Sequence, residues 1–197
     1  MAINPKQRVA LHAANLVEQN MVVGLGTGST ANFFIEALAK RCKTEKLNIQ
    51  TVSSSAISAV KAREAGLPVV SIADLDSLDI YVDGADEVTP DLTLLKGRGQ
   101  DLVNEKLLAS AADQFFVLVD ESKLVEHIGD SFPIPVEVMP QAWRLVLTQL
   151  KHQGGEGQLR LNASGDNVAV TASGSLVLDM QFKDMDSLEL TMILDTI

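Results

Sequence analysis

Four charged side chains that together could move a proton on a small anionic substrate lie within one short part of the sequence, residues 83–105. Asp83 and Asp86 come directly after a short apolar run, and Lys96 follows in a glycine-containing segment. Glu105 then stands in a segment with a helical pattern. A carboxylate can remove a proton and return it to a neighbouring atom, while a lysine stabilises the negative charge that develops in between. These residue types therefore indicate proton-transfer chemistry.

Each of these side chains also has an ordinary structural interpretation. Aspartate beside glycine, as at Asp83 and Gly84, is typical of a solvated turn. Two aspartates alone provide too few ligands for a divalent metal site made only of protein groups. Lys96 precedes a flexible turn as many surface lysines do, and the helix dipole favours an acid such as Glu105 in a first turn. One such residue would indicate little, but the combination favours a site.

A glycine-rich loop offers a place for an anion. Residues 24–30 follow a strand pattern and precede a helical one, where backbone N–H groups and the helix dipole favour negative charge. The loop lacks the Gly-Lys-Ser/Thr of a P-loop, and Ser29 stands where a dinucleotide-binding fingerprint has its third glycine. On the loop alone, phosphate binding and a tight turn without a ligand both remain open.

The elements that would position these residues alternate between strands and helices. Strand patterns run over 21–25, 49–52, 68–72, 79–82 and 115–119, and helical patterns over 9–17, 31–41, 102–112 and 141–152, with a further helix between the N-cap candidates 53–55 and Gly66. This βαβ rhythm predicts a parallel sheet, whose strands bind ligands at their carboxyl ends. The run 115–119 gives the strongest central-strand pattern.

The pattern changes in the last third of the chain. Three prolines within 133–140 favour a crossing segment or an edge strand, and short strand-like pieces follow around Leu159 and Val168. We therefore predict an α/β protein with two domains. A Rossmann-like parallel-sheet domain is expected over 1–130, and a smaller α+β domain over 131–197.

Composition excludes several classes of function. The chain of 197 residues has 16 Lys plus Arg against 26 Asp plus Glu, and a formal net charge of −10 argues against nonspecific nucleic-acid binding. Cys42 is the only cysteine, which rules out an intrachain disulfide and a cysteine-rich metal site. No signal-peptide pattern and no apolar run of membrane-spanning length is present, so we expect a cytoplasmic protein without a membrane partner.

Several motifs, in their order along the chain, resemble those of one enzyme family. GLGTGST, SSSAIS, YVDGADE, LLKGRG, NEK and DESK are similar to the motif set of type A ribose 5-phosphate isomerases, from the first helix to about Asp179. The resemblance implies an aldose-ketose isomerase that interconverts ribose 5-phosphate and ribulose 5-phosphate through a cis-enediolate, in the pentose phosphate pathway. It also implies a homodimer or homotetramer that uses no metal and no organic cofactor, with a ferredoxin-like smaller domain.

The same resemblance assigns roles to individual residues. Glu105 would transfer the proton, Lys96 would stabilise the enediolate, and Asp83 would assist ring opening. The substrate-binding positions that it implies are Thr27, Gly28, Ser29, Thr30, Asp83, Gly84, Ala85, Asp86, Lys96, Gly97, Arg98, Gly99 and Lys123.

Two departures from the family pattern leave alternatives open. Arg98 replaces the middle glycine of a KGGG loop. An arginine costs free energy if that position needs a positive φ or a close backbone approach; otherwise its guanidinium points to solvent or adds a phosphate contact. The final strands of the family do not follow before Ile197, so we expect a smaller domain that lacks them. The alternative function is a sugar-phosphate-binding or sensor module with impaired catalysis.

Overall fold

The computed structural model describes residues 4–183 and 185–196, which form two compact units. Unit 1 lies within Met1–Ala85 and Val103–Ser122, and unit 2 lies within Asp86–Leu102 and Lys123–Ile197. The chain therefore passes from one unit to the other three times.

The expected domain boundary near residue 130 assigns the segment 86–102 to the first domain, whereas this segment packs with unit 2. Leu95 in the segment shares a buried apolar cluster with Ile134 and Leu190, which explains the grouping. A single cut in the sequence cannot describe such a segment, because stretches of unit 1 precede and follow it.

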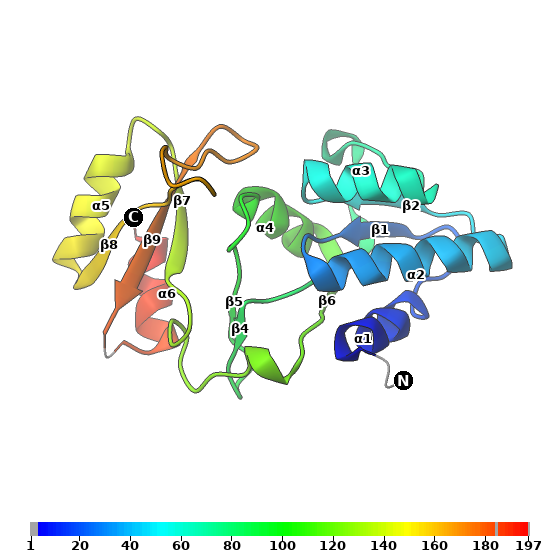
Figure 1. Cartoon of the computed structure of the whole chain (residues 1–197), viewed down its shortest axis with the longest axis horizontal. Helices are drawn as coiled ribbons and strands as arrows, with labels where there is room; N and C mark the ends of the chain where they lie inside the picture. Colours follow the sequence, from blue (N-terminus) through cyan, green and yellow to red (C-terminus); the bar gives the residue numbers. More distant parts are fainter. Residues whose placement is uncertain (1–3, 184, 197) are drawn as a thin grey trace. The chain divides into compact units, whose positions relative to one another are not determined.

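Unit 1 is built on a parallel sheet of four strands in the order β2-β1-β3-β6 (Figure 1). The strands are β1 (Val22–Leu25), β2 (Gln50–Ser53), β3 (Leu78–Asp83) and β6 (Ala112–Val117). The helices are α1 (Pro5–Ala14), α2 (Ser29–Glu45), α3 (Ala56–Ala65) and α4 (Leu102–Ala111). The parallel sheet predicted from the sequence is confirmed.

Successive residues of β3 face two different apolar layers. Ile80 packs with Phe34 of α2 in one buried cluster, whereas Tyr81 packs with Leu108 of α4 in another. Side chains alternate in this way because a strand has a period of two residues. Asp83, two residues after Tyr81, therefore lies on the same side of the sheet as Tyr81.

Turn residues set the helix ends around the glycine loop. α2 begins after Gly28, whose φ of 114° would be strained with a side chain. α3 begins after Ser55, whose hydroxyl accepts the N–H of Ser58, and it ends at Gly66 with a φ of 88°. The N-cap expected within 53–55 and the helix end expected near Gly66 are confirmed.

Two predictions about strands in unit 1 are wrong. The segment 68–72 forms no strand, since only Val69 makes an isolated bridge to Thr51 and a 3-10 turn follows. Pro68 has no N–H to donate to a ladder, which accounts for the weak pairing. The strand expected over 115–119 is β6, which begins earlier and stands at the end of the strand order instead of its centre.

Unit 2 contains a hairpin and an antiparallel sheet of three strands in the order β7-β9-β8. The hairpin strands are β4 (Glu87–Val88) and β5 (Leu94–Leu95), and the sheet strands are β7 (Ile134–Val138), β8 (Gly155–Leu159) and β9 (Leu176–Phe182). Helices α5 (Trp143–His152) and α6 (Ser187–Asp195) pack on this sheet through residues such as Leu150 and Ile193. The smaller α+β architecture is confirmed; β9 was not predicted, and Val168 forms only an isolated bridge.

None of the helices within residues 4–183 and 185–196 combines the length and the apolar character needed to cross a membrane.

Candidate active site

The carboxylate of Asp83, at the carboxyl end of β3, is buried and accepts hydrogen bonds from neighbouring residues of unit 1. Oδ1 accepts the N–H of Gly84 at 2.8 Å and that of Thr27 at 3.1 Å. Oδ2 accepts the hydroxyl of Tyr81 at 2.7 Å. The relative exposure of Asp83 is 2%, unlike that of a solvated turn residue. Unit 1 therefore brings together the glycine loop that contains Thr27 and the loop that follows β3.

Two glycines at the end of β1 make room for this arrangement. A Cβ at Gly26 would lie 2.0 Å from Oδ1 of Asp83. A Cβ at Gly24 would lie 2.6 Å from the ring of Tyr81, which stacks on Phe115 of β6 with ring centroids 5.0 Å apart. The glycines of this loop thus have a role that the anion-binding interpretation did not include: they provide space for two side chains of the neighbouring strand.

Tyr81 is absent from the predicted site residues, although its phenol touches Asp83. Burial raises the pKa of this phenol, and the negative charges of Asp83 and Glu105 raise it further. The phenol therefore keeps its proton at neutral pH and remains a donor to the Asp83 carboxylate. Its position two residues before Asp83 on a strand is the signal that could have identified it.

Glu105 lies in the first turn of α4 with a relative exposure of 7%. The preceding residue, Asn104, donates from Nδ2 to the carbonyl oxygen of Ser54 at 3.1 Å, which ties the start of α4 to the chain just after β2. The charge of Glu105 contributes to the raised pKa of Tyr81. Glu105 is therefore buried, and its charge acts on the phenol of Tyr81. Under the ordinary interpretation, it would instead be a solvated acid in the first turn of a helix.

The hydroxyl of Thr27 forms hydrogen bonds within the protein. Thr27 Oγ1 donates to Ser55 Oγ at 2.7 Å, and Ser58 Oγ donates to the carbonyl oxygen of Gly26 at 2.7 Å. Together these bonds hold the glycine loop against the start of α3. Thr27 therefore positions the loop through its side chain and Asp83 through its amide.

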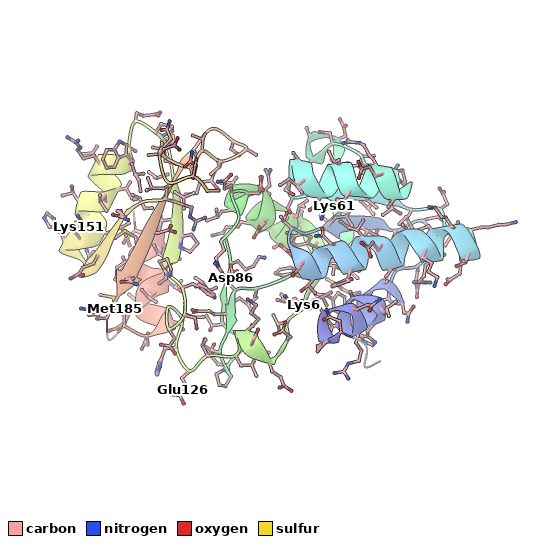
Figure 2. All side chains as sticks on the ribbon, in the orientation of Figure 1. Lys6, Lys61, Asp86, Glu126, Lys151 and Met185 are labelled. Atoms are coloured by element: carbon pink, nitrogen blue, oxygen red, sulfur yellow. The ribbon has the colours of Figure 1, made fainter. Side chains whose placement is uncertain are left out.

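The start of α2 presents groups that suit an anion. Gly28 and Ser29 are exposed there, where the helix dipole favours negative charge. Lys6 of α1 donates from Nζ to Ser29 Oγ at 3.1 Å, so an ammonium group lies beside this helix end (Figure 2). Lys6 is absent from the predicted site because it stands 23 residues before Ser29, outside every motif.

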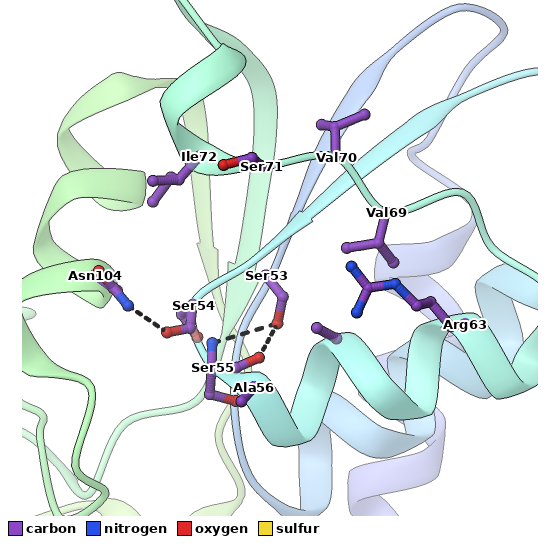
Figure 3. Close-up of a pocket in the computed structure, with 11 residues that line it drawn as sticks. Ser53, Ser54, Ser55, Ala56, Arg63, Val69, Val70, Ser71, Ile72 and Asn104 are labelled. Carbon is purple, nitrogen blue, oxygen red and sulfur yellow. Dashed lines mark hydrogen bonds between the residues drawn. The ribbon is translucent and has the colours of Figure 1, made fainter. Parts of the chain in front are cut away.

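A separate pocket of about 240 Å³ lies at the carboxyl end of β2 (Figure 3). Its described lining includes Ser53, Arg63, Val69, Ser71 and Asn104, which Figure 3 labels. None of the predicted site residues is among the residues that line it. This pocket is therefore distinct from the position predicted for the substrate.

In unit 2, several predicted site residues lie at the hairpin of β4 and β5. The N–H of Asp86 donates to the carbonyl oxygen of Leu95 at 2.8 Å, which places the aspartate at the hairpin end next to Lys96. Oδ2 of Asp86 accepts the N–H of Arg98 at 3.1 Å. Gly97 has a φ of 97°, which favours glycine. Asp86 thus holds the loop that follows Lys96.

Arg98 fits this loop without the strain that its sequence position suggested. The φ of Arg98 is not positive, in contrast to that of Gly97. Its guanidinium carbon lies 3.9 Å from the centre of the Phe132 ring, a cation–π contact. Lys123, at the end of a 3-10 turn, has its Nζ 5.7 Å from the same ring centre. The sequence left open solvent or a phosphate as the surroundings of this guanidinium. It did not indicate a contact with the ring of Phe132.

Among the described residues, no three His, Cys, Asp or Glu side chains lie close enough together to hold a metal ion.

In sequence, this chain is similar to known proteins of one family. Residues 50–197 match the family model described as ribose 5-phosphate isomerase A, or phosphoriboisomerase A. Ribose-5-phosphate isomerase A of Thermococcus kodakarensis is 44% identical over 194 residues, which cover 98% of this chain and 85% of the relative.

Solved structures show the same similarity. Ribose 5-phosphate isomerase A from Methanocaldococcus jannaschii has a TM-score of 0.92 at 39% identity, with 98% of this chain and 86% of that chain covered. A D-ribose-5-phosphate isomerase in complex with phospho-erythronic acid has a TM-score of 0.91 at 37% identity, with 100% of this chain and 87% of that chain covered.

Proposed function

Because the chain belongs to the ribose 5-phosphate isomerase A family, it is an aldose-ketose isomerase, and we propose that Asp83, Lys96 and Glu105 carry out its reaction. The enzyme interconverts ribose 5-phosphate and ribulose 5-phosphate. The observation that carries this function is the family match over residues 50–197, a range that contains all three side chains. The phospho-erythronic acid bound by a relative supports a sugar-phosphate substrate.

In the proposed mechanism, Glu105 moves a proton between two carbon atoms of the open-chain sugar. Its carboxylate removes the proton from C2 of the aldose, which leaves a cis-enediolate, and then returns that proton to C1. The hydroxyl proton of O2 passes to O1, so that the product is the ketose. The burial of Glu105 supports this role, because a site shielded from bulk water limits proton exchange with solvent.

Lys96 stabilises the negative charge that grows on the sugar oxygens, together with the backbone amides of the 97–99 loop. Asp86 orients sugar hydroxyls, and Lys123 provides a further substrate contact. The contact between Asp86 and the Arg98 amide supports a role of this aspartate in shaping the loop as well.

Asp83 assists ring opening by exchanging a proton with the ring or anomeric oxygen of the cyclic sugar. Proton transfer of this kind requires a carboxyl group held in one orientation. The donors Tyr81, Thr27 and Gly84 hold Asp83 in this way, which supports the assignment.

The remaining substrate-binding positions that we propose are the loop Thr27, Gly28, Ser29 and Thr30 for the phosphate, with Gly84, Ala85, Gly97, Arg98 and Gly99 around the sugar. The ammonium group of Lys6 beside Ser29 supports phosphate binding at the start of α2.

A direct assay with ribose 5-phosphate, in which the ribulose 5-phosphate formed is measured, tests this function. Turnover by the unmodified protein supports the isomerase. Binding of ribose 5-phosphate without turnover would instead favour the sugar-phosphate sensor.

An Arg98→Gly variant bears on the same choice. We expect its kcat to stay within about threefold of the unmodified value, because this loop is proposed to act on the sugar through its backbone amides, which glycine keeps. Arg98 needs no positive φ, and its guanidinium already has a partner in Phe132. A rise of about tenfold or more in kcat would show that the arginine impairs catalysis and would favour the sensor.

Replacement of Lys6 by alanine is expected to raise KM for ribose 5-phosphate about tenfold and to change kcat little, since one charge-assisted hydrogen bond to phosphate is worth about 1.5–3 kcal/mol. Steady-state kinetics would measure the change. Lys61→Ala is a matched control, because Lys61 is an exposed lysine on α3 of the same unit. An unchanged KM in the Lys6 variant would remove Lys6 from the phosphate site.

We infer further, from the family alone, that the enzyme is a cytoplasmic homodimer or homotetramer that needs neither a metal nor an organic cofactor. Analytical ultracentrifugation would measure the oligomeric state.

A further inference from the structure

Arg160 has no part in the mechanism above, yet its backbone and side chain are both held firmly within unit 2. Its N–H donates to the carbonyl oxygen of Val177 at 2.8 Å, and its own carbonyl oxygen accepts the N–H of Ala169 at 2.9 Å. The side chain is only 13% exposed. The guanidinium is therefore fixed at one place in the unit.

That guanidinium forms hydrogen bonds with one carboxylate and three carbonyl oxygens. Nε lies 3.1 and 3.0 Å from the two carboxylate oxygens of Asp179, and Nη2 lies 2.5 Å from Oδ1. Nη1 donates to the carbonyl oxygens of Gly97 at 2.9 Å, Arg98 at 3.3 Å and Gly99 at 2.6 Å. The rigid fork of arginine allows both sets of contacts at once, which a lysine ammonium cannot reproduce.

The carbonyl contacts determine which way the loop amides point. In a trans peptide the C=O and the following N–H point in opposite directions, so the amides after these three carbonyls point away from Arg160. The first of them, that of Arg98, donates to Asp86 Oδ2. Within the part of the chain that the structure describes, the amides of Gly99 and Gln100 donate to no protein group, and both residues are exposed. Successive amides directed to one side form a concavity that suits an anion.

We propose that Arg160, held by Asp179, is a positioning residue for the isomerisation. By binding three successive carbonyl oxygens, it turns the amides of Gly99 and Gln100, in the loop that follows Lys96, toward the negative charge of the enediolate. Arg160 itself does not touch the substrate. This inference rests on the role proposed above for Lys96 and its loop.

A purely structural ion pair between Arg160 and Asp179 would have a different signature. Its loss would lower the stability of unit 2 and leave kcat per folded molecule unchanged. A positioning role predicts a loss that falls on kcat more than on KM, because amides directed at the enediolate act mainly in the transition state.

The test compares kcat and KM of Arg160→Met, Arg160→Lys and the unmodified enzyme with ribose 5-phosphate, normalised to the folded fraction. We expect Arg160→Met to lose about 10–100-fold in kcat with KM changed by less than about threefold. Added guanidinium ions, far below denaturing concentrations, should restore part of the kcat of Arg160→Met and leave the unmodified enzyme unaffected. Arg160→Lys keeps the charge and the apolar stem, so it tests the proposal even where Arg160→Met does not fold, with an expected loss of about tenfold.

Two comparisons separate this inference from the function on which it rests. Arg144→Met removes an exposed arginine of the same unit, whose guanidinium lies over Trp143, and should leave kcat unchanged. If the unmodified protein does not form ribulose 5-phosphate, the isomerase function itself fails. If the unmodified protein is active and the folded Arg160 variants match it in kcat, or guanidinium ions give no recovery, the positioning role is overturned and the function stands.

Discussion

A Glu105→Gln variant is expected to bind ribose 5-phosphate with a nearly unchanged KM and to lose about a thousandfold in kcat, within the range that general acid-base catalysis contributes. Glutamine keeps the shape of glutamate, but it cannot accept the proton from C2 or return it to C1. The proposed role of Glu105 is therefore removed while its space in the first turn of α4 stays filled. Steady-state formation of ribulose 5-phosphate would measure kcat and KM.

Proton exchange in heavy water adds a second measurement on the same variant. Because the buried site limits exchange of the transferred proton, the unmodified enzyme should introduce solvent deuterium at C1 in only a minor share of the product, and the variant should lose this exchange together with turnover. Lys106→Gln is a matched control, because the next residue of α4 is exposed and should tolerate glutamine. Turnover of Glu105→Gln within about tenfold of the unmodified enzyme would contradict the assignment of Glu105 as the base.

The parallel sheet of unit 1 could be predicted because its signals are local. Short apolar runs end in loops rich in glycine, serine or aspartate at β1, β2 and β3, and helical patterns follow. β6 shows what such signals leave out. The apolar run 115–119 indicated a central strand, but among the described strands β6 pairs only with β3. The side chain of Phe115 is covered by the stacked ring of Tyr81.

β9 was missed although a signal was present. Leu178, Met180 and Phe182 alternate with polar residues, the period expected of a half-buried strand, and Leu178 and Met180 are buried in the core of unit 2. The grouping of 86–102 with unit 2 had no local signal. It depends on the burial of Leu95 among residues that are distant in the sequence.

The proposed site divides in the same way between motif residues and the residues proposed to support them. Asp83, Lys96 and Glu105 stand in recognisable motifs, so their roles could be proposed from the sequence alone. Those of Lys6 and Arg160 could not, because their contacts join segments 23 and more than 60 residues apart. These supports consist of hydrogen bonds to hydroxyls and carbonyl oxygens, and such bonds leave no pattern in a single sequence.

Gly26 is where sequence and structure give different reasons for the same residue. The loop 24–30 indicates an anion site with flexible glycines, but at Gly26 the decisive neighbour is a side chain. A Cβ there would lie 2.0 Å from Oδ1 and 2.2 Å from Cγ of Asp83, far inside contact distance. The carboxylate of Asp83 therefore has to move when this glycine is replaced.

A Gly26→Ala variant is thus expected to lose about 1–3 kcal/mol of folding free energy through overpacking, and about a hundredfold in kcat through misplacement of Asp83. Urea unfolding and isomerase kinetics on the folded fraction would measure the two losses. The cause can be isolated in an Asp83→Gly background, where the clashing side chain is gone and Gly26→Ala should cost much less free energy of unfolding. An equal cost in both backgrounds would mean that Asp83 is not what requires a glycine at position 26.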